Sequence, residues 1–365
     1  MFPGTFSDEQ VELRSVVRAL LEKHSTEAEV RRLMATEEGF DRVLWRRMAV
    51  EAGLQGLAVP EEHGGGGFGY VELGIVFEEM GRALLCAPFL ASAALATEVL
   101  LRCGDGTARK DLLPSIVAGE TVATLALVDD GDAVHAHPRG GGWTVTGTKT
   151  YVLDGHIADL VIVTARSGAG LSLFVVDAMA SGLTRTWLPT LDQTRKQARL
   201  DFDAAPARLV GVEGDAAPIV EGVLATGTIL LAAEQVGGAS KTLELAVEYA
   251  KLRVQYGRPI GSFQGIKHLC ADLLTEVESA RSALYDALWS LAAGSADVPI
   301  AAAVARICAS EAYTKAAGDC VQVHGGIGFT WEHPAHLHFK RAKSSELLFG
   351  TPAHHRERLA VRLGM

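Results

Sequence analysis

The sequence lacks the features that mark secreted, disulfide-linked or nucleic-acid-binding proteins. Its five cysteines are odd in number, widely scattered and never spaced as Cys-x-x-Cys, which argues against a disulfide framework and against a thiolate zinc site. The formal net charge of −10 is spread along the chain without a basic stripe, which argues against nucleic acid as a main partner. No region combines few apolar residues with high charge, so we expect a chain that is folded throughout.

Long apolar runs are also missing. None approaches the ~18 residues of a membrane-spanning helix, and the N-terminal residues show no basic region followed by an apolar one, as a signal peptide would. We therefore expect a soluble, non-secreted protein that has no membrane partner and resides in the reducing cytoplasm. The chain does have length, because 365 residues allow a large core and roughly two or three domains.

Hydrophobic periodicity predicts helices in the first third of the chain. Ser7 and Gln10 have capping-box spacing, and apolar residues at helical spacing follow them. Similar patterns recur over residues 43–52 and 71–84, separated by a turn-rich stretch of glycines. These patterns predict a helical domain over residues 1–118.

The pattern then changes twice. Short β-branched or alternating runs between Gly, Asp and Pro predict a small antiparallel β-domain over residues 119–214. Three long stretches nearly free of proline predict a helical bundle over residues 215–365. The expected strands fall at 121–128, 143–145, 160–165, 171–176 and 198–202, and the expected helices at 224–252, 263–293 and 300–323.

Two further patterns resemble ligand sites only formally. Gly64, Gly66 and Gly69 have the spacing of the dinucleotide fingerprint, but a polar turn precedes them where a strand is required, and no βαβ unit surrounds them. Three histidines near the C-terminal end lack a carboxylate or cysteine at metal-ligand spacing, which favours a polar surface segment over a metal site. These histidines are His333, His336 and His338.

Two segments of the last region carry the residue types of an anion site. A helix end, a turn and the next helix start place Arg253, Tyr256 and Gln264 where a guanidinium can clamp a phosphate. Taken alone, this segment is by default interpreted as a capped helix turn with an exposed arginine. Residues 321–330 add the amide of Gln322 and glycines that allow a ligand to approach the backbone closely, which favours the anion site.

With these segments in place, the sequence resembles the acyl-CoA dehydrogenase family over nearly its whole length. The matching segments, in the family's order, are residues 59–65, 77–82, 147–149, 253–264 and 322–329. The resemblance implies an α+β fold with an N-terminal helical domain, a middle antiparallel β-domain and a C-terminal four-helix bundle. It also implies FAD as cofactor, acyl-CoA as substrate and electron-transfer flavoprotein as electron acceptor.

The resemblance also implies which residues bind the cofactor. In the family, the C-terminal domain of one subunit holds the ADP part of an FAD whose flavin rests in the neighbouring subunit. The family's residue types for this task are present as Arg253, Gln264, Gln322, Gly325 and Gly326, and Tyr256 lies in the same segment. We therefore expect these six residues to be the cofactor-binding set.

The flavin-facing segments differ from the family pattern. The family's Thr-Glu-Pro-x-x-Gly-Ser-Asp loop, whose hydroxyls and backbone reach flavin and substrate, aligns with residues 128–133, which lack that signature. On the following strand, the family's Trp becomes Tyr151 and its flavin-contacting Thr becomes Leu153. A hydrogen bond to the flavin ring is therefore lost.

The catalytic base of the family is also missing. Its chemistry needs a carboxylate that removes the α-proton while hydride leaves the β-carbon for the flavin. Phe349 occupies the commoner position of this base, and the alternative position falls near Gly227. By the resemblance, the neighbouring carboxylates of Glu234 and Glu346 are not placed to substitute, so we expect no catalytic residue in this chain.

These differences predict the non-catalytic subunit of a heterotetramer (α₂β₂), as found in bacterial catabolism of sterols and other bulky acyl groups. The chain would complete the FAD site of a homologous catalytic partner that dehydrogenates acyl-CoA thioesters. The alternatives are a self-sufficient homotetramer whose base has migrated, and a flavin-dependent oxidase or monooxygenase of the same fold. A cofactor-free scaffold would leave Arg253 and Gln322 without a physical reason.

Overall fold

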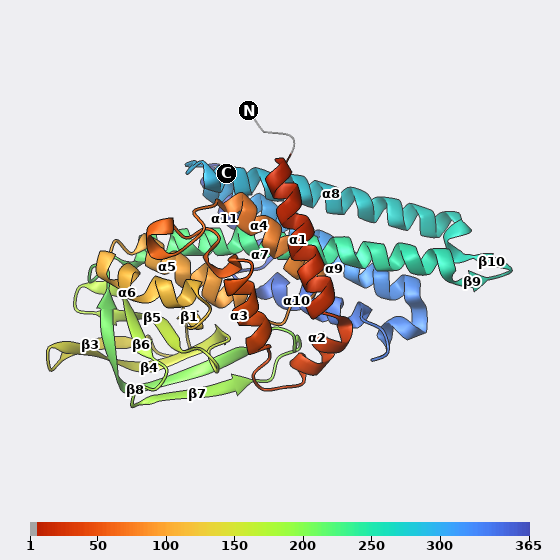
Figure 1. The fold of residues 1–365 in the computed structure, drawn as a ribbon. Helices are drawn as coiled ribbons and strands as arrows, with labels where there is room; N and C mark the ends of the chain where they lie inside the picture. The colour runs from red at the N-terminus through yellow and green to blue at the C-terminus, as the bar shows by residue number, and fades with distance from the viewer. Residues whose placement is uncertain (1–5) are drawn as a thin grey trace. The chain divides into compact units, whose positions relative to one another are not determined.

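The structure, a computed structural model, describes residues 6–365 (Figure 1). The chain divides into two compact units. The first contains the described part of Met1–Arg31 together with Tyr70–Leu85 and Thr228–Met365, and the second contains Arg32–Gly69 and Cys86–Gly227. Each unit draws on more than one of the regions expected from the sequence. The domain bounds 1–118, 119–214 and 215–365 therefore stay a prediction.

The first unit is built from helices. Its core lies among four of them, where small and branched side chains from α7, α8, α9 and α10 pack in one buried cluster. The elements are α1 (Asp8–His24), the first part of α2 (Glu27–Met34), α4 (Tyr70–Arg82), α7 (Ala216–Leu252) from Thr228 onward, α8 (Gln264–Ala292), α9 (Val298–His324), α10 (Ala335–Leu347) and α11 (Pro352–Arg362). A short hairpin, β9 (Val254–Gln255) and β10 (Arg258–Pro259), joins α7 to α8.

The sequence signals for these helices are confirmed in detail. The backbone N–H of Gln10 donates to Oγ of Ser7 at 3.2 Å, and the N–H of Ser7 donates to Oε1 of Gln10 at 3.1 Å, which is the reciprocal capping box that starts α1. The helices α8 and α9 begin and end within two residues of the stretches expected from the sequence. Only α7 differs, because it begins earlier, at Ala216.

Two glycines allow α4 and α7 to cross at close range. A Cβ added to Gly81 would lie 1.9 Å from the carbonyl oxygen of Glu234, and one added to Gly237 would lie 1.8 Å from the carbonyl oxygen of Glu78. Any side chain at either position would therefore push the helices apart. This packing gives the physical reason for Gly81 in the segment 77–82. From the sequence, that segment was recognised only by its resemblance to the family.

Composition alone makes α7 unusual. Among the described residues it is the one helix long and apolar enough to cross a membrane, and more than half of its most apolar window is buried in the fold. The sequence analysis expected no such stretch, because it searched for uninterrupted apolar runs. Buried core helices of bundles have the same composition, so this is weak evidence for a membrane span.

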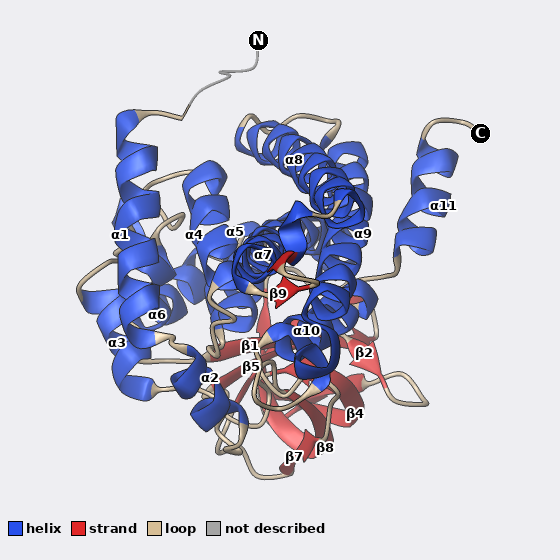
Figure 2. Ribbon diagram, turned by 90° about the vertical axis from the view of Figure 1, so that its right-hand side faces the viewer, coloured by secondary structure: helices blue, strands red, loops and turns tan. Residues whose placement is uncertain are grey.

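The second unit holds one eight-stranded sheet, drawn in red in Figure 2, together with short helices. The strands are β1 (Ala123–Ala126), β2 (Val128–Asp129), β3 (His135–Arg139), β4 (Gly142–Leu153), β5 (Leu160–Ser167), β6 (Gly170–Asp177), β7 (Leu183–Leu188) and β8 (Gln197–Val210). The helical elements include α3 (Arg42–Val50), a π-helical turn at Leu90–Ala96, α5 (Thr97–Arg102) and α6 (Gly106–Val117).

The sequence pattern predicts an antiparallel sheet, but the observed sheet also contains parallel pairs. The strand β1 pairs with β5 in parallel register, from Ala123 opposite Leu160, and β3 meets β5 in parallel at His135 and Arg166. The reason is topological: β2, β3 and β4 lie between β1 and β5 in the chain, which gives the long connection that a parallel pair requires. The strands β3 and β7 were missed because they are mostly exposed and lack an apolar face.

A buried carboxylate on α4 ties three helices of the first unit together. Only 1% of Glu78 is exposed, and its oxygens accept a hydrogen bond from the hydroxyl of Tyr285 on α8 at 2.7 Å and pair with Arg14 on α1 at 3.0 Å. Arg281 on α8 also pairs with it. Such a charge is tolerated in the interior only because it is fully paired.

The next residue repeats the arrangement. Glu79, also buried, receives two parallel hydrogen bonds from Arg18, at 2.7 and 2.8 Å, and a third from Arg14 at 3.3 Å. Arg82 lies 3.6 Å away and binds Glu244 on α7 through two hydrogen bonds of 2.8 Å. The acidic pair within 77–82 is therefore a structural anchor.

Removing the first of these carboxylates should destabilise the first unit strongly. We expect Glu78→Ala to cost about 3–5 kcal/mol in the free energy of unfolding, because it leaves buried cations without their partner. Urea unfolding followed by circular dichroism measures this. Glu278→Ala is the matched control, since Glu278 pairs with the same Arg281 at an exposed position and should cost less than about 1 kcal/mol.

The same pair gives stability a defined pH dependence. Burial alone would raise the pKa of Glu78, but Arg281 and Arg14 lower the pKa below its usual value. The pKa of Glu78 is lower in the folded state than in the unfolded state. The stabilisation that ionised Glu78 provides is therefore fully present above about pH 4.3, and it is lost as the pH falls through the folded pKa. The stability gap between wild type and Glu78→Ala should therefore narrow in acid, and an equal gap at pH 7 and pH 3 would contradict this assignment.

Candidate cofactor and catalytic site

The corner between α7 and α8 is a tight hairpin. The backbone N–H of Arg253 continues the helix by donating to the carbonyl of Tyr249 at 2.8 Å, and the carbonyl of Arg253 accepts the N–H of Ile260 at 2.8 Å. Tyr256 and Gly257 form the two-residue loop with φ of 53° and 75°, as a type I′ turn requires. The sequence predicted only a turn, although the Tyr-Gly pair was a signal for this geometry.

The polar groups of this corner face solvent. Tyr256 is 93% exposed, and the Arg258 guanidinium lies 4.0 Å from the centre of the Phe263 ring. Gln264 is the first residue of α8, and its amide Nε2 lies 3.2 Å from Nε2 of His268. Arg253 is also exposed, so its charge and the Gln264 amide are open to a ligand.

The loop after α9 offers open backbone. Gly325 has a φ of 65° and ends the helix, and the amide-bearing Gln322 precedes it by one turn on an exposed position. A Cβ added to Gly325 or Gly326 would meet no atom within 4 Å, whereas one at Gly328 would lie 2.8 Å from the Val321 carbonyl oxygen. Space for a ligand therefore exists over the first two glycines.

These two segments lie at one end of the bundle. Since α7 ends, α8 begins and α9 ends there, their terminal residues share one buried cluster (Figure 1). Its members include Ala250, Ile260, Ile266, Val321 and Val323. A guanidinium, two amides and open glycine backbone fit the diphosphate and adenosine half of a dinucleotide. Five of the six residues expected to bind cofactor share this end as a polar surface, and Tyr256 marks its hairpin tip.

The expected base position carries a strained apolar residue. Phe349 follows α10 and has a φ of 61°, which is rare for a bulky side chain. Arg306 on α9, fully buried, donates to the carbonyl oxygens of Ser345 and Leu348 and so holds the turn in place. The alternative base position, Gly227, is a buried residue of α7. Neither position supplies a proton acceptor.

The neighbouring carboxylates are already engaged. Oε1 of Glu234, a residue with 7% exposure, accepts a hydrogen bond from Arg341 of α10 at 2.6 Å. Glu346 pairs with Lys343 at 2.8 Å. From the sequence, both glutamates were rejected as the base because of their positions alone. The pairing of Arg341 with Glu234 was not predicted, because 107 residues separate the two and no local pattern marks the pair.

In the second unit, a buried lysine fixes the segment that replaces the flavin loop. Lys149, 1% exposed, donates to Oδ1 of Asp129 at 2.6 Å, to the carbonyl of Leu127 at 2.9 Å and to the hydroxyl of Thr164 at 3.0 Å. Burial lowers the pKa of Lys149, and the bond to Asp129 opposes that shift. The Gly-Thr-Lys match at 147–149 is thus explained as an anchor for β2.

The rest of this segment is acidic and tied to the sheet. Asp130 pairs with Arg199 at 2.5 Å, and Arg199 pairs in turn with Asp201 at 3.0 Å. Tyr151 lies at a bulge of β4 with a φ of 53° and is 60% exposed, whereas Leu153 is buried. The hydroxyl groups that the family offers to flavin are therefore replaced by paired carboxylates and an apolar side chain.

The three histidines near the C-terminal end do not converge. Each lies against a different aromatic or hydroxyl neighbour, namely His333 with His324, His336 with Trp331, and His338 with Tyr313. Among residues 6–365, no group of three or more His, Cys, Asp or Glu side chains is arranged to hold a metal ion. The five cysteines are all free thiols.

The helical unit and the eight-stranded sheet can now be compared with known proteins. Residues 7–120 match the family model for the acyl-CoA dehydrogenase N-terminal domain, and residues 217–364 match that for the C-terminal domain. The chain belongs to the acyl-CoA dehydrogenase family. The family, the fold and FAD as cofactor, all expected from the resemblance, are thereby confirmed.

Similar proteins include an acyl-CoA dehydrogenase, a steroid ACAD and a two-protein complex. Acyl-CoA dehydrogenase IpdE2 of Mycobacterium tuberculosis is 37% identical over 354 residues, which cover 94% of each chain. A variant of the Tcur3481-Tcur3483 steroid ACAD is 33% identical with a TM-score of 0.89 over 98% of each chain. The ChsE4-ChsE5 complex from Mycobacterium tuberculosis is 32% identical with a TM-score of 0.91, over 99% of this chain and 98% of that one.

The activity of the family is oxidoreduction of acyl-CoA, for which bound FAD supplies the hydride acceptor. In this chain, Arg253 would pair with the cofactor's diphosphate, Gln264 and Gln322 would donate amide hydrogen bonds, and Gly325 and Gly326 would allow close approach. These roles rest on the residue types and on their placement at one end of the bundle.

Arg253 gives a direct test of this assignment. We expect Arg253→Met to weaken FAD binding by at least about tenfold, because a charge-assisted hydrogen bond to phosphate is worth roughly 1.5–3 kcal/mol. Flavin absorbance of the purified native assembly, titrated with FAD, measures this. Lys251→Met removes a cation two residues away that pairs only with Glu248, and it should leave FAD binding unchanged. Equal affinities in both variants would refute the role of Arg253.

Proposed function

We propose that this chain is the non-catalytic subunit of a heteromeric acyl-CoA dehydrogenase, in which it completes the FAD site of a homologous catalytic partner. The single observation that carries the proposal is Phe349 at the family's base position. An aromatic ring cannot accept the α-proton of an acyl-CoA thioester. The alternative position near Gly227 has no side chain at all.

The surrounding charges support the proposal. A substitute base needs a carboxylate that is free to reach substrate, but Glu234 is held by Arg341 and Glu346 by Lys343. Each of these carboxylates already has a cationic partner within the chain. A proton acceptor from another subunit is the simplest way to complete the chemistry.

The difference between the two segments that the family uses to bind FAD also supports the proposed subunit role. The corner with Arg253, Gln264 and Gln322 keeps the groups that suit an anionic ligand. In contrast, the segment 128–133 offers carboxylates where the family offers hydroxyls. A chain that donates the ADP clamp to a partner's FAD, while its own flavin position is unused, accounts for both observations.

Two of the similar structures bear names that join two chains, ChsE4-ChsE5 and Tcur3481-Tcur3483, and the second is described as a steroid ACAD. From this likeness we propose a heterotetramer acting on the CoA thioester of a sterol side chain or another bulky acyl group. We further propose a cytoplasmic location, electron-transfer flavoprotein as acceptor, and no membrane or nucleic-acid partner.

Flavin stoichiometry tests the subunit role. We expect the chain purified alone to contain no flavin, and the complex co-purified with a homologous partner to contain about one FAD per two chains and to oxidise acyl-CoA. Absorbance and mass measurements give the ratio. One FAD per chain with turnover alone would identify a self-sufficient homotetramer, and flavin without affinity for CoA thioesters would identify an oxidase or monooxygenase.

Substitution at the base position tests the same role in another way. We expect Phe349→Leu to leave kcat of the complex within a factor of about two, because the side chain takes no part in proton transfer. Replacing the base of the partner subunit in the same complex should abolish turnover. A large loss of kcat from Phe349→Leu alone, with FAD content unchanged, would contradict the proposal.

A further inference from the structure

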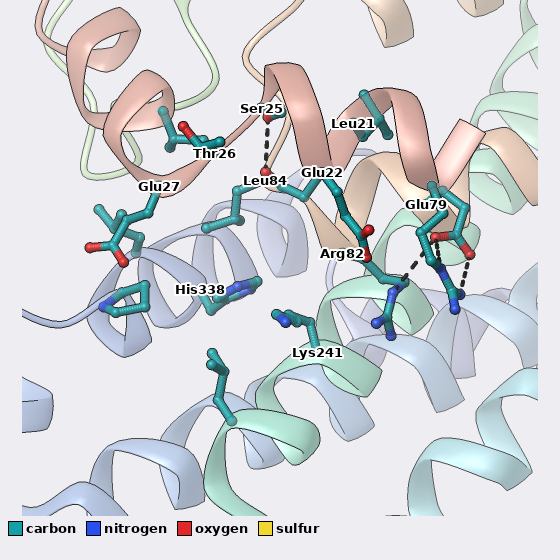
Figure 3. A pocket seen from close by; sticks show the side chains of 16 residues that line it. Leu21, Glu22, Ser25, Thr26, Glu27, Glu79, Arg82, Leu84, Lys241 and His338 are labelled. Atoms are coloured by element: carbon teal, nitrogen blue, oxygen red, sulfur yellow. Dashed lines mark hydrogen bonds and ion pairs between the residues drawn. The ribbon is translucent and has the colours of Figure 1, made fainter. Parts of the chain in front are cut away.

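A cavity of about 340 Å³ lies inside the first unit, within the size range of small-molecule sites (Figure 3). Its walls come from the end of α1, the start of α2, the end of α4, the middle of α7 and the first turn of α10. Most of the wall is apolar, formed by Leu21, Val30, Leu84, Leu245 and Leu337. None of the residues assigned to FAD or to the base position lines it.

The cavity is remote from the base position. His338, which lines it, precedes Phe349 by eleven residues, and most of that interval is the helix α10. At 1.5 Å per residue this is about 16 Å along the helix. On α7, Lys241 is likewise about 20 Å of helix from Gly227. The cavity therefore lies apart from both positions at which the family carries its base.

One side chain on the cavity wall is a nearly buried histidine. His338 is 3% exposed, and its Nδ1 lies 2.9 Å from the hydroxyl of Tyr313. Figure 3 shows the ring pointing into the cavity, which leaves Nε2 on the cavity side. A ring nitrogen in this position can form a hydrogen bond with a polar atom bound in the cavity.

Burial and neighbouring cations act together on the His338 ring. Burial comes first, and the cations of Arg341, Lys241 and Arg82 follow, in lowering the pKa of His338 to about 3. The ring is therefore neutral at physiological pH, and when Nδ1 accepts from Tyr313, Nε2–H is a donor aimed into the cavity. A donor beside these cations suits an anion.

The charged side chains around the cavity differ in how closely they are paired with opposite charges. Glu79 is neutralised by arginines, and Arg82 is held by Glu244. Lys241 has only a distant contact, 3.9 Å to the same Glu244. The two remaining lining acids, Glu22 and Glu27, are exposed to solvent, where their charges are screened.

We propose that this cavity binds an amphipathic carboxylate, with its apolar body against the leucine-rich wall and its carboxylate between the Lys241 ammonium and Nε2 of His338. A carboxylate satisfies both groups at once, since it accepts from the ammonium and from the ring N–H. A cation placed there would be repelled by the Lys241 ammonium, and a purely apolar ligand would leave both donors without an acceptor.

Ligand-binding calorimetry on the full chain, alone or in its native complex, tests the proposal with octanoate as the probe. Octanamide has the same shape without the charge, and it should bind at least about tenfold more weakly, because a charge-assisted hydrogen bond is roughly twice as strong as a neutral one. Equal affinities for the two compounds, or no saturable binding of octanoate at millimolar concentration, would overturn the proposal.

Variants locate the site. Lys241→Met should weaken octanoate binding about tenfold, whereas Lys315→Met, which removes a similarly exposed cation with an acidic neighbour on α9, should not. Leu245→Trp should fill the cavity and abolish binding without changing any charge. Retention of octanoate binding by Leu245→Trp with an intact circular dichroism spectrum would place the ligand elsewhere and refute the assignment.

The result is independent of the subunit role. Octanoate binding requires neither FAD nor a partner, so its failure leaves the heteromer proposal intact. Conversely, one FAD per chain with turnover alone would overturn the subunit role while leaving the cavity assignment standing. Flavin content, measured on the same samples, separates the two.

Discussion

The helical unit depends on a pair of adjacent carboxylates that are denied solvent. Glu78 and Glu79 sit on α4 at a point where α7 crosses it almost in backbone contact, so neither side chain can turn outward to water. Their charges must be met by cations from α1 and α8, and Arg14 serves both. Because burying two anions costs several kcal/mol each unless cations neutralise them, the packing of α1, α4 and α8 must keep these ion pairs. That packing sets the bundle whose ends carry the cofactor corner.

The same constraint recurs wherever this chain buries a charge. Arg306 is fully buried and holds the turn before Phe349, Arg341 holds Glu234, and Lys149 holds Asp129. In each case the ion is bound by structural partners within the chain. A catalytic acid or base requires the opposite state, a titratable group poised with an unsatisfied site toward substrate. These buried charges therefore serve the architecture of the unit in which each lies.

The sequence predicted most of this fold, and the failures share a cause. Periodicity and capping located α1, α8 and α9 because their signals are local. The parallel pairing of β1 with β5 escaped detection because sheet order is decided by contacts far apart in sequence. The strands β3 and β7 are mostly exposed, so their hydrophobic periodicity is weak. Partners such as Arg341 for Glu234 were invisible for the same reason, since pairing across 107 residues leaves no local pattern.

The site was predictable only in part, for a related reason. The residue types at Arg253, Gln264 and Gln322 were legible from the sequence, but their common position at one end of the bundle depends on three helices running in alternating directions. At the base position, in contrast, the sequence showed only that Phe349 has no carboxylate. The structure adds that Phe349 has a positive φ and that Arg306 binds the carbonyl oxygen of the preceding Leu348. The geometry of the turn therefore does not depend on a carboxylate. Cofactor holding and proton abstraction are physically separable in this fold, which is what a division of labour between two related subunits requires.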